Sequence, residues 1–109
     1  MLEITVDLKQ NSIRMSGHAN TDERGKDLVC SAASILFYTL ADTLTRLKDG
    51  LKKEPRIRVP KDEKNIDAFI SCHPKDAYTI NFQTVYFTVV NGFQLLAESY
   101  PDNVTIKFI

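Results

Sequence analysis

The chain has 109 residues, the length of a single domain with one modest core. Its 14 lysines and arginines balance 14 aspartates and glutamates, and the sequence pI is about 6.7. This balance excludes a global field that would draw the protein to nucleic acid or to an anionic membrane. A local basic patch is still a possible interpretation of five residues, which a solvated helix end and an edge strand also explain. These residues are Lys48, Lys52, Lys53, Arg56 and Arg58.

The number of cysteines and the length of the apolar stretches indicate the cellular compartment in which the protein is expected. Two cysteines far apart in the sequence do not make a disulfide framework, and the N-terminus, MLEITVDLKQ, lacks the basic and then apolar run of a signal peptide. The longest nearly apolar stretch, near residues 85–97, is interrupted by polar residues and is too short to span a bilayer. We therefore expect a soluble protein in a reducing cytosol.

Alternating apolar and polar residues predict two strands at the start of the chain. Residues 2–8 alternate with period two, residues 10–11 offer a tight turn, and residues 13–18 resume the alternation. His18 is therefore expected to end the second strand, on the face opposite its apolar residues. Residues 19–26 lack apolar periodicity and predict a mobile loop.

A helix of about six turns is predicted from Asp27 to a stop at Gly50, because the apolar period changes to three and four. Asp27 is the expected N-cap, since its carboxylate can accept hydrogen bonds from free N–H groups of the first turn. Cys30 then falls at the third helical position. The predicted core stripe is Val29, Ala33, Leu36, Leu40, Leu44 and Leu47, with a neighbouring stripe of Cys30, Ser34, Phe37 and Ala41.

The second half of the chain predicts three strands and a second helix. Residues 56–60, 66–73 and 104–108 read as strands. Residues 76–100 contain many β-branched side chains, but an unbroken 25-residue strand would be far too long, so a helix is favoured. The whole chain, residues 1–109, thus predicts one α+β domain of order β-β-α-β-β-α-β, with two helices packed on one mainly antiparallel sheet. The apolar stripe of the second helix is Phe82, Val85, Val89, Phe93, Leu96 and Tyr100.

His18 and Cys30 are a candidate catalytic pair. The first turn of a helix lowers the pKa of a cysteine thiol, and a histidine can take the thiol proton and later protonate a leaving amine. Free N–H groups at the helix start can also hold an oxyanion. The loop between them can extend about 28 Å, which permits contact without requiring it. A packed Cys30 and a solvated His18 explain the same residues, so chemistry alone leaves both interpretations open.

The remaining pair, Cys72 and His73, does not predict a second site. Adjacent residues on a strand point to opposite faces, which excludes a local dyad. Cys72 continues the apolar face of its strand and is expected to be a buried, inert thiol. The four cysteines and histidines also lack any paired zinc spacing, so no metal site is expected.

The stretch from Gly17 to Ser34 resembles the signature of the ribosomal-processing cysteine protease family (the Prp family) of Gram-positive and related bacteria. The shared features are Gly-His-Ala at 17–19, Gly-x-Asp at 25–27, an apolar pair before Cys30 and a serine four residues after it. Residues 98–104 also resemble the family's ending. The order of predicted elements agrees with the family along the whole chain.

This resemblance implies a small cytoplasmic α+β homodimer that removes a short N-terminal extension from the large-subunit ribosomal protein L27 before ribosome assembly. It implies no cofactor, no direct contact with nucleic acid and no membrane. By position, Cys30 would be the nucleophile and His18 the general base and acid. The family's supporting positions fall on Asp27, which would cap the helix and organise the site, on Ser34, which would support the cysteine environment, and on Gly17 and Gly25, of which Gly25 would let the loop move.

Three alternatives remain open beside the processing protease. Ser31 stands where the family commonly has alanine, and the sequence after residue 50 matches only loosely, so a divergent protease could cleave another protein. A noncatalytic ribosome- or protein-binding domain could retain the motif. A thiol redox protein would need Cys72 as the partner of Cys30. If the ribosomal substrate is correct, an apolar groove is implied, for which Phe37, Tyr38 and aromatic residues of the second helix are candidates, although core packing is their default assignment.

Overall fold

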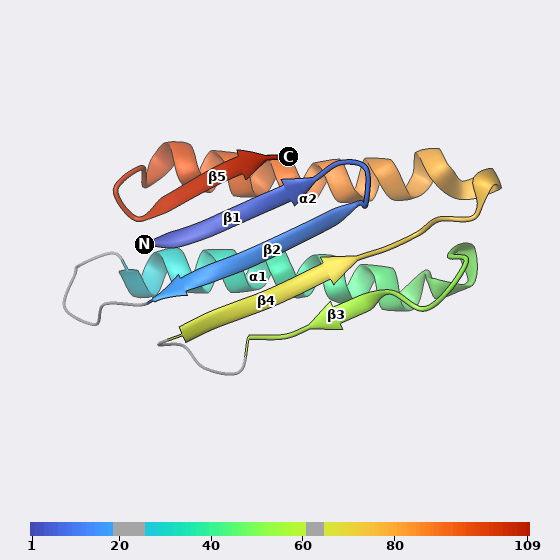
Figure 1. The fold of residues 1–109 in the computed structure, drawn as a ribbon, viewed down its shortest axis with the longest axis horizontal. Coiled ribbons are helices and arrows are strands. Elements are labelled where there is room, and N and C mark those ends of the chain that lie inside the picture. Colours follow the sequence, from blue (N-terminus) through green and yellow to red (C-terminus); the bar gives the residue numbers. More distant parts are fainter. Residues whose placement is uncertain (19–25, 61–64) are drawn as a thin grey trace.

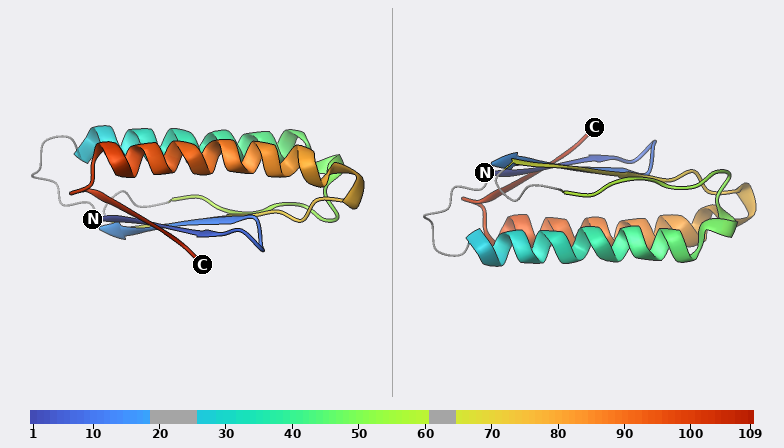
Figure 2. Two further views of the ribbon diagram at one scale, coloured as in Figure 1. Left: turned by 90° about the horizontal axis from the view of Figure 1, so that it is seen from above. Right: turned by 90° about the horizontal axis from the view of Figure 1, so that it is seen from below.

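A five-stranded sheet carries two long helices on one of its faces and leaves the other face uncovered (Figures 1 and 2). The computed structural model describes residues 1–18, 26–60 and 65–109. The predicted α+β class and the β-β-α-β-β-α-β order are confirmed. The elements are β1 (Leu2–Asp7), β2 (Ser12–His18), α1 (Lys26–Arg46), β3 (Arg56–Arg58), β4 (Asn65–Ser71), α2 (Thr79–Ser99) and β5 (Val104–Phe108), with short 3-10 turns η1 (Lys48–Gly50) and η2 (Asp76–Tyr78).

The sheet has the strand order β3-β4-β2-β1-β5. Three of the four pairings are antiparallel, as predicted, and only β1 with β5 is parallel. The β1–β2 turn has Asn11 at φ +47°, a left-handed conformation that asparagine tolerates. The Asp7 side chain closes this turn by accepting hydrogen bonds from the N–H groups of Lys9 and Gln10 at 3.0 and 3.3 Å.

The core lies between the sheet and the two helices, as alternation along the strands predicts. In α1 the buried arc is wider than one stripe, because the helix packs on the sheet and also lies beside α2 (Figure 2). Phe37 is therefore fully buried, although the sequence placed it beside the core stripe, and Leu47, predicted in the core, is 47% exposed. Along α2 the sequence missed Tyr86 and Val90, which are also buried.

Several element boundaries differ from the predictions. α1 begins at Lys26, so Asp27 is its second residue rather than the cap, and Cys30 is its fifth residue rather than its third. Helix ends are the least precise feature of a periodic pattern, since the first turn need not bury any apolar residue. The predicted loop 19–26 lies outside the described residues apart from Lys26.

The later boundaries also shift by a few residues. β3 ends at Arg58, two residues before Pro60, which has no N–H for a ladder. β4 runs over Asn65–Ser71, so Cys72 and His73 follow the strand instead of ending it. Residues 76–78 form a 3-10 turn, and the α-helix begins only at Thr79.

The prediction that residues 85–97 form the longest nearly apolar stretch is wrong, because the most apolar long segment of the described chain lies in α1. Residues Leu28–Arg46 reach a mean hydropathy of 1.4 and are long enough to cross a bilayer by length and composition. A core helix of a soluble protein meets the same two criteria, and α1 lies with one face on the sheet. The hydropathy of α1 is therefore weak support for a membrane span.

Candidate active site

Gly17 sets the backbone immediately before the candidate histidine. It lies in β2 between Leu2 of β1 and Ile66 of β4. Its φ of +149° is a conformation that side-chain-bearing residues rarely adopt, and a Cβ here would collide with the carbonyl oxygen of Met1 and lie 3.2 Å from the Cα of Leu2. Glycine at this position therefore lets the strand deliver its last residue, His18, to the sheet end.

Gly17→Ala is expected to lower the free energy of unfolding by about 2–4 kcal/mol, because it adds both backbone strain and overpacking against backbone atoms. Urea unfolding followed by circular dichroism measures the loss. Gly92→Ala is the control: its Cβ would meet only the flexible end of the Leu36 side chain, and alanine favours the helix. Equal losses in both variants would contradict this role of Gly17.

The strand end that carries His18 and the helix start that leads to Cys30 lie at the same end of the molecule (Figures 1 and 2). The His18 backbone pairs with Asn65 of β4, so β4 anchors the strand up to its last residue. Cys30 is half-buried in α1 and packs against the core. The fold thus places at one end of the molecule the two elements from which the sequence predicted a catalytic pair.

The position of Cys30 changes the expected source of its activation. The helix dipole acts mainly within the first turn, and the fifth residue of α1 lies at the start of the second. The helix start is therefore a weaker influence on the thiol than the sequence reading assumed. A charged or hydrogen-bonding neighbour would therefore have to supply more of any activation of this thiol.

The structure describes only some of the residues that were predicted to support the catalytic pair. Ser34 lies one helical turn after Cys30 and is half-buried. Asp27 is within the first turn of α1, and Gly25 lies outside the described residues. Ser31, beside the cysteine, is exposed.

Cys72 is buried, as the sequence predicted. It is 1% exposed, and burial raises the pKa of its thiol to about 11. It follows β4, whose end lies at the opposite end of the molecule from the start of α1 (Figure 1). This separation removes Cys72 as a redox partner of Cys30. Within residues 1–18, 26–60 and 65–109, no three histidine, cysteine or acidic side chains are grouped to hold a metal ion.

Comparisons with known proteins give one family match and several similar folds. The family model described as cysteine protease Prp matches residues 1–105. The fold is similar to the crystal structure of SMU.848 from Streptococcus mutans, at 24% identity and a TM-score of 0.70, over 99% of this chain and 91% of that chain. It is also similar to the essential ribosomal processing protease Prp from S. aureus in complex with a substrate peptide, at 22% identity and a TM-score of 0.68, over 99% and 97% of the two chains.

The S. aureus protease with a covalently linked product peptide is similar at 23% identity and a TM-score of 0.66, again over 99% of this chain and 97% of that one. No curated protein sequence matches the chain. The protein is thus, by class, a cysteine protease of a two-layer α+β fold. The chain belongs to the cysteine protease Prp family, since the family model covers nearly its full length.

Proposed function

We propose that this protein is a cytoplasmic endopeptidase that removes a short N-terminal extension from the large-subunit ribosomal protein L27, with Cys30 as nucleophile and His18 as general base and acid. The observation that supports it most is the convergence of the β2 end and the α1 start in a chain that the Prp family model matches. The S. aureus relative, a ribosomal processing protease with a peptide bound, supports the substrate class.

The proposed chemistry needs only the thiol, the imidazole and water, and no cofactor. His18 accepts the thiol proton, and the Cys30 sulfur attacks the carbonyl carbon of the scissile bond. The C–N bond breaks, His18 gives its proton to the leaving amine, and the extension remains on Cys30 as a thioester. Water, deprotonated by His18, then hydrolyses the thioester and restores the thiol. Backbone N–H groups of the first turn of α1 are the proposed donors to the oxyanion.

The structure narrows the choice of residues for an apolar substrate groove. Phe37 is fully buried and packs edge to face against Tyr38, with ring centroids 5.9 Å apart, so Phe37 belongs to the core. Tyr38 is 44% exposed on α1 and remains the aromatic candidate from this helix. We infer that Tyr38, rather than Phe37, is the aromatic side chain of α1 that can contact the substrate.

The homodimer is part of the proposal, and the outer surface of the helix layer supports it. No charged residue occurs in residues 28–41 of α1 or 79–97 of α2, both within the described chain. Depletion of charge together with exposed apolar side chains is typical of an interface. Ile35 is 67% exposed and Ile80 is 75% exposed, and the outer apolar face consists of Leu28, Ile35, Ile80, Phe87 and Leu95.

The proposed function is tested by incubating the extended ribosomal protein with the wild-type protein and with Cys30→Ala, followed by mass spectrometry of the products. We expect one cut near the N-terminus with the wild type and none with Cys30→Ala. Cys72→Ala is the control and should cut as the wild type does. A cut made equally by Cys30→Ala would refute the nucleophile, and intact substrate with the wild type would refute this substrate.

A further inference from the structure

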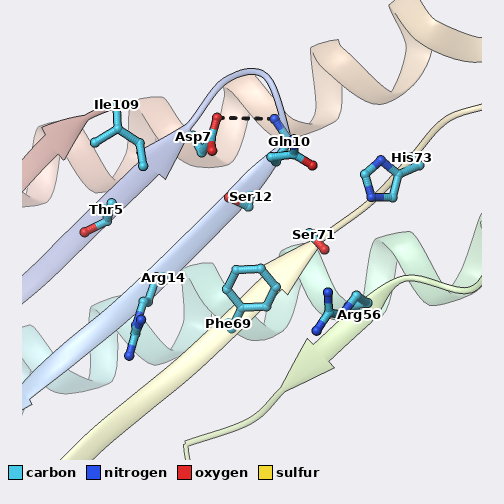
Figure 3. A pocket seen from close by; sticks show the side chains of 10 residues that line it. All are labelled: Thr5, Asp7, Gln10, Ser12, Arg14, Arg56, Phe69, Ser71, His73 and Ile109. Carbon is cyan, nitrogen blue, oxygen red and sulfur yellow. Dashed lines mark hydrogen bonds between the residues drawn. The ribbon is translucent and has the colours of Figure 1, made fainter.

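The uncovered face of the sheet contains a hollow at the end of β2 away from His18 (Figure 3). Its volume is about 390 Å³, within the range of small-molecule sites. Ser12 of β2 and Ser71 of β4 are directly paired in the antiparallel ladder and form its floor. The hollow lies on the side of the sheet opposite the helices, so it is separate from the proposed catalytic pair.

Both floor serines offer a hydroxyl to this hollow. Ser12 is 7% exposed and Ser71 is 4% exposed, so each residue is more than nine-tenths buried. Neither hydroxyl forms a hydrogen bond with any part of the chain that the structure describes, and neither oxygen is sealed from solvent. Two nearly buried hydroxyls without a protein partner therefore open into the same space, where a ligand can accept from them.

The floor is held in place from the core side. The buried Tyr86 hydroxyl donates to the carbonyl oxygen of Ser12 at 2.6 Å and lies 3.3 Å from that of Asp7. The Asp7 carboxylate is the acidic side chain beside the hollow, and one of its oxygens already accepts hydrogen bonds in the β1–β2 turn. The site is therefore preformed, and part of its negative charge is already engaged.

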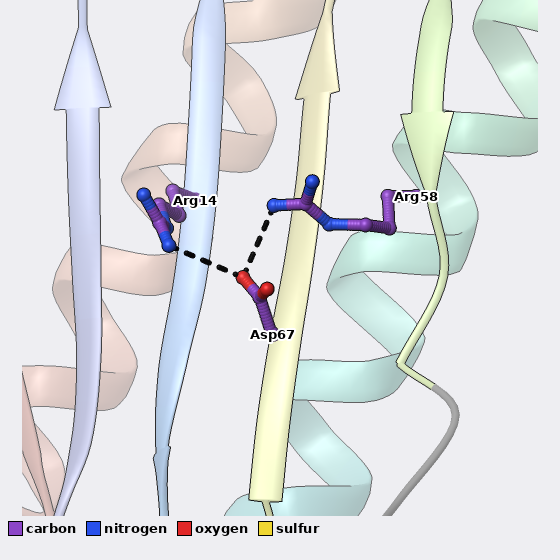
Figure 4. Close-up of polar contacts among 3 residues, drawn as sticks. All are labelled: Arg14, Arg58 and Asp67. Carbon is purple, nitrogen blue, oxygen red and sulfur yellow. Dashed lines mark hydrogen bonds and ion pairs between the residues drawn. The ribbon is translucent and has the colours of Figure 1, made fainter.

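Cationic side chains surround the floor. The Arg56 guanidinium lies over the Phe69 ring, 5.8 Å from its centroid, and forms no ion pair within the described chain. Arg14 shares the Asp67 carboxylate with Arg58, at 3.4 and 3.1 Å, so two cations face one anion (Figure 4). With Asp7 included, three guanidiniums and two carboxylate side chains lie in or beside the hollow, so cationic side chains are in excess by one.

The basic patch that the sequence left open is divided by the fold. Lys48 and Lys52 form ion pairs with Glu54 and Asp76, at 3.8 and 3.5 Å. Arg56 and Arg58 instead reach the uncovered sheet face and join Arg14, which comes from a strand far away in the sequence. The positive charge at the hollow is thus a product of strand pairing and is invisible in the net charge of zero.

We propose that this hollow binds a nucleoside phosphate. The phosphate would lie between the Arg14 and Arg56 guanidiniums and the two serine hydroxyls, and the base would stack on Phe69 or on the guanidinium that covers it. Two guanidiniums and two hydroxyls around one point suit a phosphate, with a charge of about −2 and three terminal oxygens, better than a carboxylate, which has a single charge and two oxygens. The expectation of no direct contact with nucleic acid is revised for this face alone.

The test is nuclear magnetic resonance titration of the ¹⁵N-labelled wild-type chain with adenosine monophosphate, adenosine, inorganic phosphate, a single-stranded RNA oligonucleotide and a polyglutamate peptide. We expect saturable shifts of the Ser12, Phe69 and Ser71 amides with the monophosphate. Arg56→Gln should weaken this binding about tenfold, the effect of one charge-assisted hydrogen bond. Lys53→Gln makes the same charge change on an exposed neighbouring loop and should leave the affinity unchanged.

The outcomes separate the ligand classes. Tighter binding of the oligonucleotide than of the monophosphate supports a nucleotide within RNA, and equal binding supports a free nucleotide. Equal weakening by Arg56→Gln and Lys53→Gln, the absence of saturable shifts, or binding of polyglutamate as tightly as the monophosphate would overturn the proposal. None of these results depends on cleavage by Cys30, so the proposed protease function can fail or succeed independently.

Discussion

Iodoacetamide at pH 7 is expected to alkylate Cys30 at least about a hundredfold faster than Cys72. Burial raises the pKa of the Cys72 thiol to about 11, so only about one molecule in ten thousand carries its reactive thiolate at this pH. A cysteine of ordinary acidity is a few per cent thiolate under the same conditions, and Cys30 is only half-buried. Peptide mass spectrometry after timed labelling measures both rates.

This difference alone does not establish a catalytic pair, because the burial of Cys72 is sufficient to produce it. The pair is tested by the dependence of Cys30 labelling on His18. A neighbouring imidazolium stabilises the thiolate, so His18→Gln is expected to slow labelling of Cys30 at pH 6.5 by about tenfold or more. His73→Gln removes the other histidine, at the far end of β4, and should have no effect.

The dependence of the Cys30 labelling rate on pH is a second, independent test of the pair. In the wild type the labelling rate should reach its plateau at a lower pH than in His18→Gln, while at pH above 9 the two rates should converge because an ordinary thiol is then ionised as well. Identical profiles for both proteins would show that His18 does not act on Cys30. Cys30 would then be an ordinary packed residue of the helix, which is the alternative that the sequence left open.

The local pattern of apolar and polar residues was sufficient to predict the strand and the helix around the candidate site. Alternation along residues 13–18 predicted the strand that ends at His18, and the change of period after it predicted the helix that contains Cys30. The short connection between them permitted their convergence without requiring it, and the packing of α1 on the sheet places their adjoining ends at the same end of the molecule. The position of Cys30 within the helix was two residues in error, since apolar periodicity does not show which residue begins the first turn.

Features that depend on distant pairing could not be derived in this way. Phe37 is central because α1 contacts both the sheet and α2, and no property of α1 alone reveals a second neighbour. The hollow exists because Ser12 pairs with Ser71, residues 59 positions apart, and because β3 then adds Arg56 beside them. The pairing between strands sets their order and therefore the charge of each sheet face. The sequence of a single strand does not show which strands will be its neighbours.

Ile35→Glu is expected to weaken the proposed homodimer at least about a hundredfold. Ile35 is 67% exposed at the centre of the uncharged outer face of α1, and a twofold interface would contain the new carboxylate twice. Like charges brought together at an interface cost several kcal/mol, and 1.4 kcal/mol corresponds to a tenfold change in affinity. Sedimentation velocity over a range of protein concentrations measures the shift from dimer to monomer.

A second variant, Ile80→Glu, tests the other helix in case the contact is centred on α2. Leu8→Glu introduces the same charge at a 46% exposed leucine in the β1–β2 turn, away from the outer face of the helices, and should leave the dimer intact. A monomeric wild type, or wild-type sedimentation of both isoleucine variants, would contradict the proposed interface.

Dissociation and damage to the site are distinguishable in the same variants. His18 and Cys30 both belong to one chain, so a folded monomer should keep the wild-type labelling rate of Cys30. Leu28, which is 59% exposed, precedes Cys30 by two residues and belongs to the proposed interface, so a partner bound there would border the site. We therefore expect the monomer to retain labelling but to cleave the extended substrate more slowly, a combination that a merely unfolded variant would not show.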